Sequence, residues 1–400
     1  MPSRQATERI APAIAPGELR RSLRLFRDGS TFRFTPNGNA TLLSTCFGVL
    51  LAELCGDLRA APDEYDPIAS TISARQDQDG FWRDPIFWPG DLKGEHTPEY
   101  VLWQQSYFAL HALDSLGKSP LRPLKFVEPF VEPARAVQWL RERDFRNFWY
   151  ASNEIMWLMS FLAWLESDGM AAAGRALDAM LDELDYSQDP RTGFWGTDRG
   201  ATLLNGMAGA FHIYYFYLWR RRPVRYVEAI IENTLSLQQP DGLFHPGGGG
   251  GSCHDLDAVD ILVEFSRIST HRSRDVASAL DRASRGLMIT RNPDGGFCER
   301  RWKPRRSWKR RLGEAIGLDT LLGKRRAVEE PIYWYSGWVR MECRVNESNI
   351  WATWFRPLAW ALISARYPER YGDAGGWTFR RLPGLGWQSG VSAHRRNRDA

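Results

Sequence analysis

Apolar positions along the chain follow helical spacing, and they do so in two different ways. The stretch 224–238 is amphipathic, because Val227, Ile230, Ile231 and Leu235 fall on one face of a helix and polar residues lie between them. Other stretches are apolar or aromatic on most faces, which is typical of helices that are buried all round. These stretches are 40–54, 99–116, 151–165, 203–219, 255–268 and 349–367. Amphipathic helices that alternate with buried ones predict an outer ring of helices around an inner ring.

A short turn pattern recurs between these helices. Its copies read QDQDGFW at 76–82, QDPRTGFW at 188–195, QQPDGLF at 238–244 and NPDGGF at 292–297. The later copies lie about 50 residues apart, which suits one helical hairpin per repeat, and 137–149 fits as a degenerate copy. Pro, Asp and Gly make each copy a turn, and its aromatic residue packs the turn onto its neighbours. Six outer–inner helix pairs predict an all-α (α/α)6 barrel or toroid, with an open helical solenoid as the alternative.

The turn pattern resembles the QW repeats of the terpene cyclase and protein prenyltransferase superfamily, over about residues 66–367. The resemblance implies a toroid with a central cavity. Within it, DLDA at 255–258 is similar to the D-x-D-D motif of class II terpene cyclases, which implies Asp257 as a general acid supported by Asp255. Prenyltransferase β subunits bind zinc near the start of an inner helix, which leaves room for zinc at Cys253, His254 or His245. No other cofactor is predicted.

Polar residues near the starts of the inner helices are expected to line the mouth of the ring. A carboxyl group that is buried in the water-free interior of the ring has a raised pKa and can act as an acid. The catalytic candidates are therefore Asp257, Asp255 and Asp260. Candidates for substrate binding are Glu99, Gln104, Gln105, Asn153, Glu154, Asn205, His212, Glu347, Asn349, Trp157 and Tyr215. Helix capping and core packing are the structural alternatives for these residues. The glycine run at 247–251 suits close backbone approach, loop movement or a plain flexible loop.

Three functions suit such a cavity. The first is a terpene cyclase or prenyltransferase-like enzyme that acts on an isoprenoid or lipid-linked substrate with an aspartate as general acid, and the sequence favours it. The second is a glycan-active (α/α)6 hydrolase, lyase or epimerase, because amides, carboxylates and abundant Trp suit sugars and glycosidases use two carboxyl groups. The third is a non-catalytic binding scaffold.

The distribution of charge predicts a basic surface segment, and the cysteine content bears on the cellular compartment. The segment 300–326 is rich in Lys and Arg with interspersed Trp and Leu, which predicts either a solvated insertion or peripheral contact with anionic membrane. A net charge of +4 does not indicate nucleic-acid binding. Five scattered cysteines and no apolar leader predict a cytoplasmic protein. We expect 1–30 to hold the first outer helix, 31–387 the toroid, and 388–400 a flexible tail.

Overall fold

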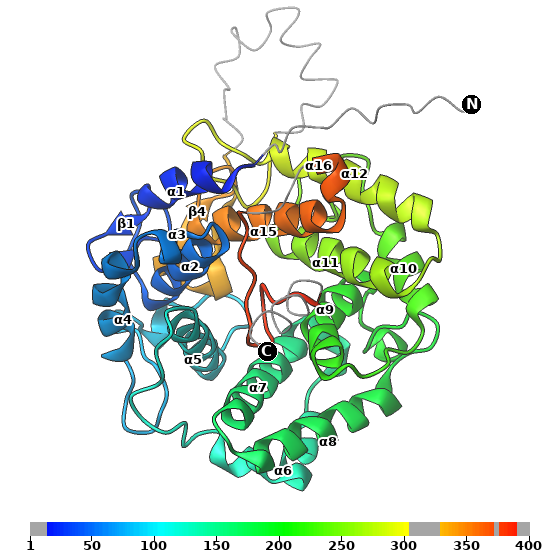
Figure 1. The fold of residues 1–400 in the computed structure, drawn as a ribbon, viewed down its shortest axis with the longest axis horizontal. Helices are drawn as coiled ribbons and strands as arrows, with labels where there is room; N and C mark the ends of the chain where they lie inside the picture. Colours follow the sequence, from blue (N-terminus) through cyan, green and yellow to red (C-terminus); the bar gives the residue numbers. More distant parts are fainter. Residues whose placement is uncertain (1–13, 304–328, 372–375, 390–400) are drawn as a thin grey trace, which may run out of the picture.

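In the computed structural model, residues 14–303, 329–371 and 376–389 are described. Six long helices contact one another in a closed sequence, each with the next along the chain and the last with the first. They are α2 (Leu42–Leu54), α5 (Pro98–Ser115), α7 (Phe148–Ser167), α9 (Leu203–Arg220), α11 (Ser252–Ile268) and α15 (Ile350–Arg366). The contact between α15 and α2 closes the ring (Figure 1). The predicted all-α toroid is therefore confirmed, with each inner helix at or near its predicted range.

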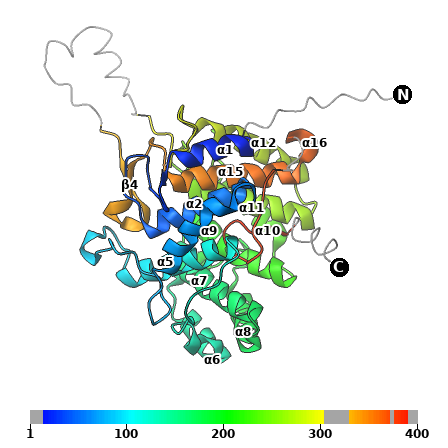
Figure 2. The ribbon, with the colours of Figure 1, turned by 60° about the vertical axis from the view of Figure 1, so that its left-hand side comes forward.

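More amphipathic helices surround this ring (Figures 1 and 2). They are α1 (Pro16–Arg24), α4 (Asp66–Ser73), α6 (Pro133–Arg141), α8 (Ala171–Ser187), α10 (Val227–Ser236) and α12 (Ser273–Ile289). The outer layer is uneven, because α6 packs chiefly against α8 rather than against its chain neighbour α7. The outer helices are thus less regular than a strict one-to-one pairing with the inner helices.

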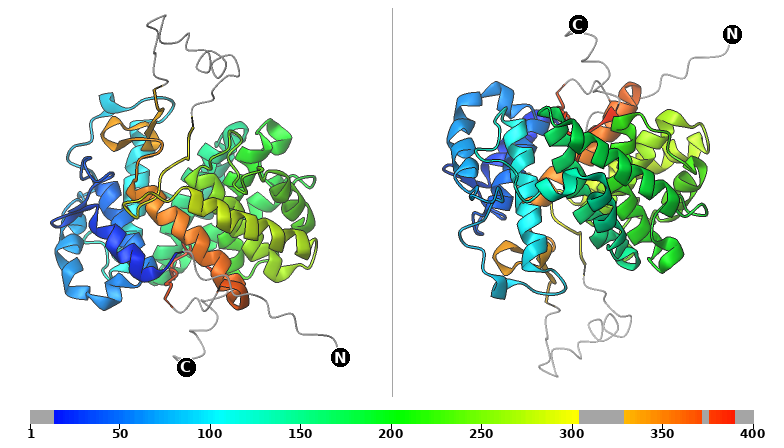
Figure 3. Two further views of the ribbon diagram at one scale, coloured as in Figure 1. Left: turned by 90° about the horizontal axis from the view of Figure 1, so that it is seen from above. Right: turned by 90° about the horizontal axis from the view of Figure 1, so that it is seen from below.

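Small elements fill the connections. Two antiparallel hairpins are formed by β1 (Arg27–Asp28) with β2 (Thr31–Phe32) and by β3 (Ile332–Trp334) with β4 (Glu342–Arg344). Short helices are α3 (Asp57–Ala60) and α16 (Pro368–Tyr371). Single 3₁₀ turns lie at Pro62–Tyr65, Pro89–Asp91, Glu128–Val131, Phe145–Asn147, Thr197–Arg199, Tyr335–Gly337 and Val339–Met341. The β3–β4 hairpin projects from one face of the ring, and the described C-terminal segment approaches from the opposite face (Figure 3).

The glutamine of the repeated turn closes the turn on itself. The side-chain amide of Gln188 donates a hydrogen bond to the carbonyl oxygen of Gly193 at 2.6 Å, and Gln238 donates to Gly242 at 2.9 Å. Gln76 makes the same bond to the carbonyl of its own turn glycine, at 3.1 Å. The glutamine thus helps to satisfy a carbonyl of the turn in these three copies, and the Tyr214 hydroxyl also donates to the Gly193 carbonyl at 2.6 Å. The last copy has Asn292 instead of Gln.

The glycine of the repeated turn docks the last three copies onto the next outer helix, whereas Gly80 of the first copy lies against the chain at 123–125. Gly242 has φ +85°, and a Cβ at this position would collide with the carbonyl of Arg282 in α12. Gly295 in the last copy has φ +91° and lies against Ser22 of α1, whose hydroxyl donates to the Gly295 carbonyl at 2.9 Å. The last turn therefore joins the first outer helix, and the same motif that builds the ring also closes it.

The predicted basic surface lies almost entirely outside the described residues, which include only its first four positions, 300–303. Membrane contact through 300–326 accordingly stays a prediction, as does the cytoplasmic location. Among the described residues, no helix is both long and apolar enough to cross a membrane.

The docking of the turn glycine can be tested against a glycine that shares its conformation but not its neighbour. Gly94 has φ +76° with open space around it, whereas Gly242 abuts α12. We expect Gly94→Ala to lower the free energy of unfolding by about 1 kcal/mol through backbone strain alone. Gly242→Ala should cost about 2 kcal/mol more, because the added methyl has no room. Urea unfolding measures both, and equal losses would contradict the docking role.

Candidate active site

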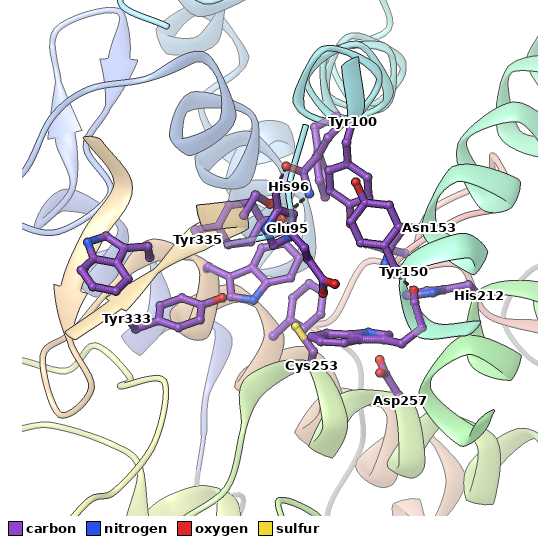
Figure 4. Close-up of a pocket in the computed structure, with 18 residues that line it drawn as sticks. Glu95, His96, Tyr100, Tyr150, Asn153, His212, Cys253, Asp257, Tyr333 and Tyr335 are labelled. Carbon is purple, nitrogen blue, oxygen red and sulfur yellow. Dashed lines mark hydrogen bonds between the residues drawn. The ribbon is translucent and has the colours of Figure 1, made fainter. Parts of the chain in front are cut away.

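A cavity of about 150 Å³ lies among the N-terminal halves of the inner helices (Figure 4). Most of its wall is aromatic. The lining residues are Glu95, His96, Tyr100, Gln104, Phe108, Trp149, Tyr150, Asn153, His212, Cys253, Asp257, Tyr333, Trp334, Tyr335, Ser336, Trp351, Phe355 and Leu385. Five inner helices, the β3–β4 hairpin, the loop before α5 and the C-terminal segment all contribute. The structure thus places Gln104, Asn153, His212 and Asp257 on one cavity.

The glycine run before α11 wraps around Asp255. The Asp255 carboxylate accepts hydrogen bonds from the backbone N–H of Phe244 at 2.6 Å and of Gly251 at 3.0 Å, and it forms a buried ion pair with Arg356. Gly250, at φ +80°, comes so close that a Cβ there would lie 2.6 Å from an Asp255 oxygen. Close backbone approach is therefore what these glycines provide.

The ion pair also decides what Asp255 can do. Both Asp255 and Arg356 are fully buried, and Arg356 donates a further hydrogen bond to the carbonyl of Glu299 at 2.6 Å. Asp255 does not line the cavity. Its position is that of an anchor for the start of α11, and a catalytic role for it stays an untested prediction.

Asp257 has the opposite environment. Its side chain is 1 % exposed, and neither carboxyl oxygen has a hydrogen-bond partner among the described residues. Burial raises the pKa of Asp257 well above its usual range, and the nearby carboxylates of Asp260 and Asp255 add to the rise. A raised pKa favours the protonated form of the carboxyl group, which can donate a proton into the cavity that it lines.

Neutral polar groups stand beside this acid. His212 lies with its Nδ1 2.9 Å from the hydroxyl of Ser152, and burial lowers the pKa of His212 to about 3, so the imidazole is uncharged. The Asn153 amide donates to the carbonyl of Trp149 at 2.8 Å, which fixes its side chain. The interior of the cavity therefore offers hydrogen bonds without a buried net charge.

The β3–β4 hairpin forms the wall opposite Asp257 (Figure 4). The Gln104 side chain accepts a hydrogen bond from the Ser336 hydroxyl at 2.7 Å and donates to the Tyr335 hydroxyl at 3.4 Å. The backbone N–H of Lys93 donates to the carbonyl of Gly337 at 2.7 Å, which ties the loop before α5 to the same hairpin. Gln104 thus positions the hairpin as well as lining the cavity.

Sequence reasoning missed most of the lining residues, among them Glu95, His96, Tyr333 and Tyr335. The signal for the two tyrosines was present in the aromatic run YWYSGW at 333–338. Glu95 and His96 precede an inner helix rather than occupy it, and no pattern in the sequence marks them.

Several predicted binding residues lie away from the cavity. Glu99 is exposed, and Asn205 is half-buried in the first turn of α9. Glu347 accepts a hydrogen bond from the backbone of Arg344 at 3.1 Å, and Asn349 is the N-cap of α15. For these residues the structure shows surface or capping positions, and their binding roles stay untested predictions.

The remaining candidates lie behind the cavity wall or beside it. Gln105 accepts a hydrogen bond from the backbone of Asp84 at 2.9 Å, and Trp157 packs its ring 4.7 Å from that of Tyr100. Tyr215 is buried, and Asp260 lies further along α11, where burial and Glu264 raise its pKa. Glu154 forms an ion pair with Arg143 at 3.0 Å.

That ion pair belongs to a second hollow next to the cavity. It has a volume of about 360 Å³ and shares Glu95 and Tyr150 with the aromatic cavity. Its other lining residues are Thr97, Glu142, Arg143, Asp144, Asn147, Ala151 and Glu154. The aromatic cavity and this groove therefore adjoin at Glu95 and Tyr150, and the groove is polar and charged.

The zinc candidates do not gather into a site. The rings of His245 and His254 lie 5.9 Å apart, and His254 packs on Trp149. In the part of the chain that the structure describes, no cluster of three or more His, Cys, Asp or Glu side chains is arranged to hold a metal ion. Cys253 lines the cavity as a thiol, because burial raises its pKa well above the usual range.

Comparisons with known proteins give distant structural neighbours only. No family model matches the sequence, and no characterised protein matches it. A solved structure of a protein from Actinoplanes has a TM-score of 0.46 and 15% identity, and the match covers 87% of this chain and 99% of that chain. A polysaccharide lyase has a TM-score of 0.42 and 12% identity over 73% of this chain and 88% of that one. Similarity at this level carries no argument about the activity of this protein.

The neutral state of Asp257 predicts a pH dependence of stability. Its folded-state pKa lies above the unfolded value of about 4, so the unfolded chain releases this proton first as pH rises. The Asp257 carboxyl therefore costs stability increasingly above about pH 4, up to its folded pKa. Asp257→Asn removes that cost, so the variant should gain on the wild type by up to about 1.4 kcal/mol per pH unit. Urea unfolding at several pH values measures the difference, and a gap that does not change with pH would contradict a neutral Asp257.

Proposed function

We propose that the protein is a glycan-active enzyme that seats one sugar ring in the aromatic cavity and uses Asp257 as a general acid. The observation that carries the proposal is the Asp257 carboxyl group, which is buried, without a partner among the described residues, and on the cavity wall. A group that is costly to bury and stabilises nothing around it is typical of a functional site.

The size of the cavity supports a ring-sized ligand. An apolar cavity of about 150 Å³ is large enough for benzene, so this cavity admits one six-membered ring and no extended chain. The C–H faces of a sugar ring pack well on aromatic side chains such as Trp149 and Trp351. Its hydroxyls can pair with Asn153 and His212, in the usual manner of a mostly apolar pocket with few polar groups.

The groove next to the cavity supports a polar chain rather than an isoprenoid tail. Its lining carries Arg143, Glu142 and Glu154, and an apolar tail would remove their hydration without replacing it. A glycan that continues from the cavity into this groove would instead find hydrogen-bond partners. Glycan chemistry is therefore the better supported of the two substrate classes.

The reaction follows from the two carboxyl groups on the cavity. Asp257, held neutral, would donate its proton to the glycosidic oxygen as the bond to the leaving sugar breaks. Glu95 lines the same cavity and is exposed to solvent, so it is the candidate for the second carboxylate, which activates water or attacks the sugar. The products are the released sugar and the shortened chain, and water supplies the added hydrogen and hydroxyl.

An isoprenoid cyclase is the second candidate. The aromatic wall favours it, because the faces of aromatic rings stabilise a carbocation and a neutral aspartic acid can protonate an alkene. The two candidates share Asp257 and differ in substrate.

Turnover by Asp257→Asn tests the shared acid. The variant keeps the size of the side chain but has no proton to donate, so we expect kcat to fall by about 10²–10⁴-fold on the oligosaccharide that the wild type cleaves. Asp275→Asn changes an exposed carboxylate that pairs with Arg272 on α12, and it should leave the rate unchanged. Release of reducing ends from a panel of oligosaccharides measures the activity.

The same assay decides between the candidates. Turnover of prenyl diphosphates or polyprenyl alcohols with no turnover of any glycan would support the cyclase instead. Sugar binding without turnover by the wild type would indicate a binding protein.

A further inference from the structure

The C-terminal segment 376–389 runs into the middle of the ring of inner helices, where the red trace passes through the centre of Figure 1. Its residue Leu385 is 4 % exposed and lines the aromatic cavity. A tail was expected only from residue 388 onward. The last described residues therefore lie inside the toroid, and Leu385 is part of the site.

Hydrogen bonds to two inner helices hold this segment in place. The backbone N–H of Leu385 donates to the Tyr107 hydroxyl of α5 at 3.0 Å, and the Ser160 hydroxyl of α7 donates to the carbonyl of Pro383 at 3.1 Å. Between these two bonds, a Cβ at Gly384 would lie 2.8 Å from the Tyr107 hydroxyl. The backbone itself thus packs against the inner wall of the ring.

Two charged contacts add to these bonds. Arg380 is 4 % exposed, with its Nε 3.6 Å from a carboxyl oxygen of Glu53 on α2, and it donates to the carbonyl of His111 on α5 at 3.3 Å. The Ser389 hydroxyl donates to Glu264 on α11. The segment is therefore anchored to α2, α5, α7 and α11. A loosely associated tail would make fewer contacts.

The segment separates two hollows. Leu385 faces the aromatic cavity. Leu382 and Pro383 line a different hollow of about 280 Å³ on the other side of the segment, here called the far hollow. That hollow is bounded by the C-terminal parts of inner helices, with Asp114 of α5 and Trp164 of α7 among its lining residues. Residues two or three apart in one segment thus belong to opposite hollows, so the segment is the wall between them.

We propose that the 376–389 segment makes the aromatic cavity blind-ended, and that the enzyme consequently acts at the non-reducing terminus of a glycan chain, with the terminal sugar ring resting on Leu385. This inference rests on the function proposed above. Because the segment lies between the aromatic cavity and the hollow beyond it, the cavity has a closed floor, with one way in and room for one ring. The floor residue then also sets which substituents on the terminal sugar are accepted.

The lengths of the products test terminal action. Oligosaccharides of a single length, labelled with a fluorophore at the reducing end, are digested by the full-length wild-type protein and separated by size at early times. We expect each labelled product to be one sugar shorter than its precursor from the first time point. A mixture of lengths at early times would show cleavage within the chain, which overturns this inference and leaves the proposed function standing. Absence of turnover on every oligosaccharide overturns both.

Substitution of Leu385 tests the floor itself. Leu385→Ala deepens the cavity, so kcat/KM for a terminal sugar with an N-acetyl group should rise about tenfold relative to the unsubstituted sugar. Leu385→Trp fills the floor and should raise KM at least tenfold for both sugars.

The matched control is Leu382→Ala. It removes the same number of side-chain atoms from the same segment, but Leu382 faces the far hollow. It should lower the melting temperature by a similar amount and leave the preference between the two sugars unchanged. An equal shift of preference in Leu382→Ala and Leu385→Ala would overturn the assignment of Leu385 as the floor.

Discussion

The buried ion pair between Arg356 and Asp255 fixes the geometry on which the site depends. Taking both charges out of water is costly, and the cost is offset only when the remaining polar atoms are also paired. Asp255 accepts hydrogen bonds from two backbone N–H groups, those of Phe244 and Gly251. Arg356 donates to the carbonyl of Glu299, whereas the Arg356 Nε has no partner among the described residues. One pair therefore joins α11, α15, the loop before α11 and the chain that leads to the basic segment.

The anchoring of Asp255 decides where Asp257 points. Two residues along an α-helix correspond to a rotation of about 200°, so a helix that turns Asp255 outward to the loop turns Asp257 toward the ring interior. The same helix thus carries one carboxylate that is fully paired and one that has no partner among the described residues. Because burial raises the pKa of the second, the chemistry of the site follows from the environment of Asp257 rather than from the residue type alone.

Local patterns in the sequence were sufficient to predict an all-α toroid. The all-round apolar stretches marked the inner helices, and the turn motif marked the joints, since Gln238 and Gly242 act within a few residues of one another. Asp257 could be singled out because it follows a turn and begins a buried helix. The same reasoning could not separate it from Asn349, which occupies a comparable place in sequence and is an N-cap in the structure.

Contacts between distant parts of the chain were beyond the reach of the sequence. The hairpin with Tyr333 and Tyr335 reaches the cavity through Gln104, more than two hundred residues earlier, and Leu385 reaches it through Tyr107. These positions depend on contacts between segments far apart in the sequence, which local periodicity does not encode. The basic segment had the clearest composition of any stretch, yet composition alone does not place it relative to the site.

The proposed chemistry requires Asp257 to be a neutral carboxylic acid in the folded protein. The ¹³C chemical shift of its side-chain carboxyl group reports the protonation state directly, in protein labelled at aspartate and compared with Asp257→Asn to assign the signal. If the Asp257 carboxyl group is protonated, its resonance should stay in the protonated position through neutral pH and be absent from the variant. A resonance for Asp257 that titrates near the ordinary aspartate pKa of about 4 would contradict it.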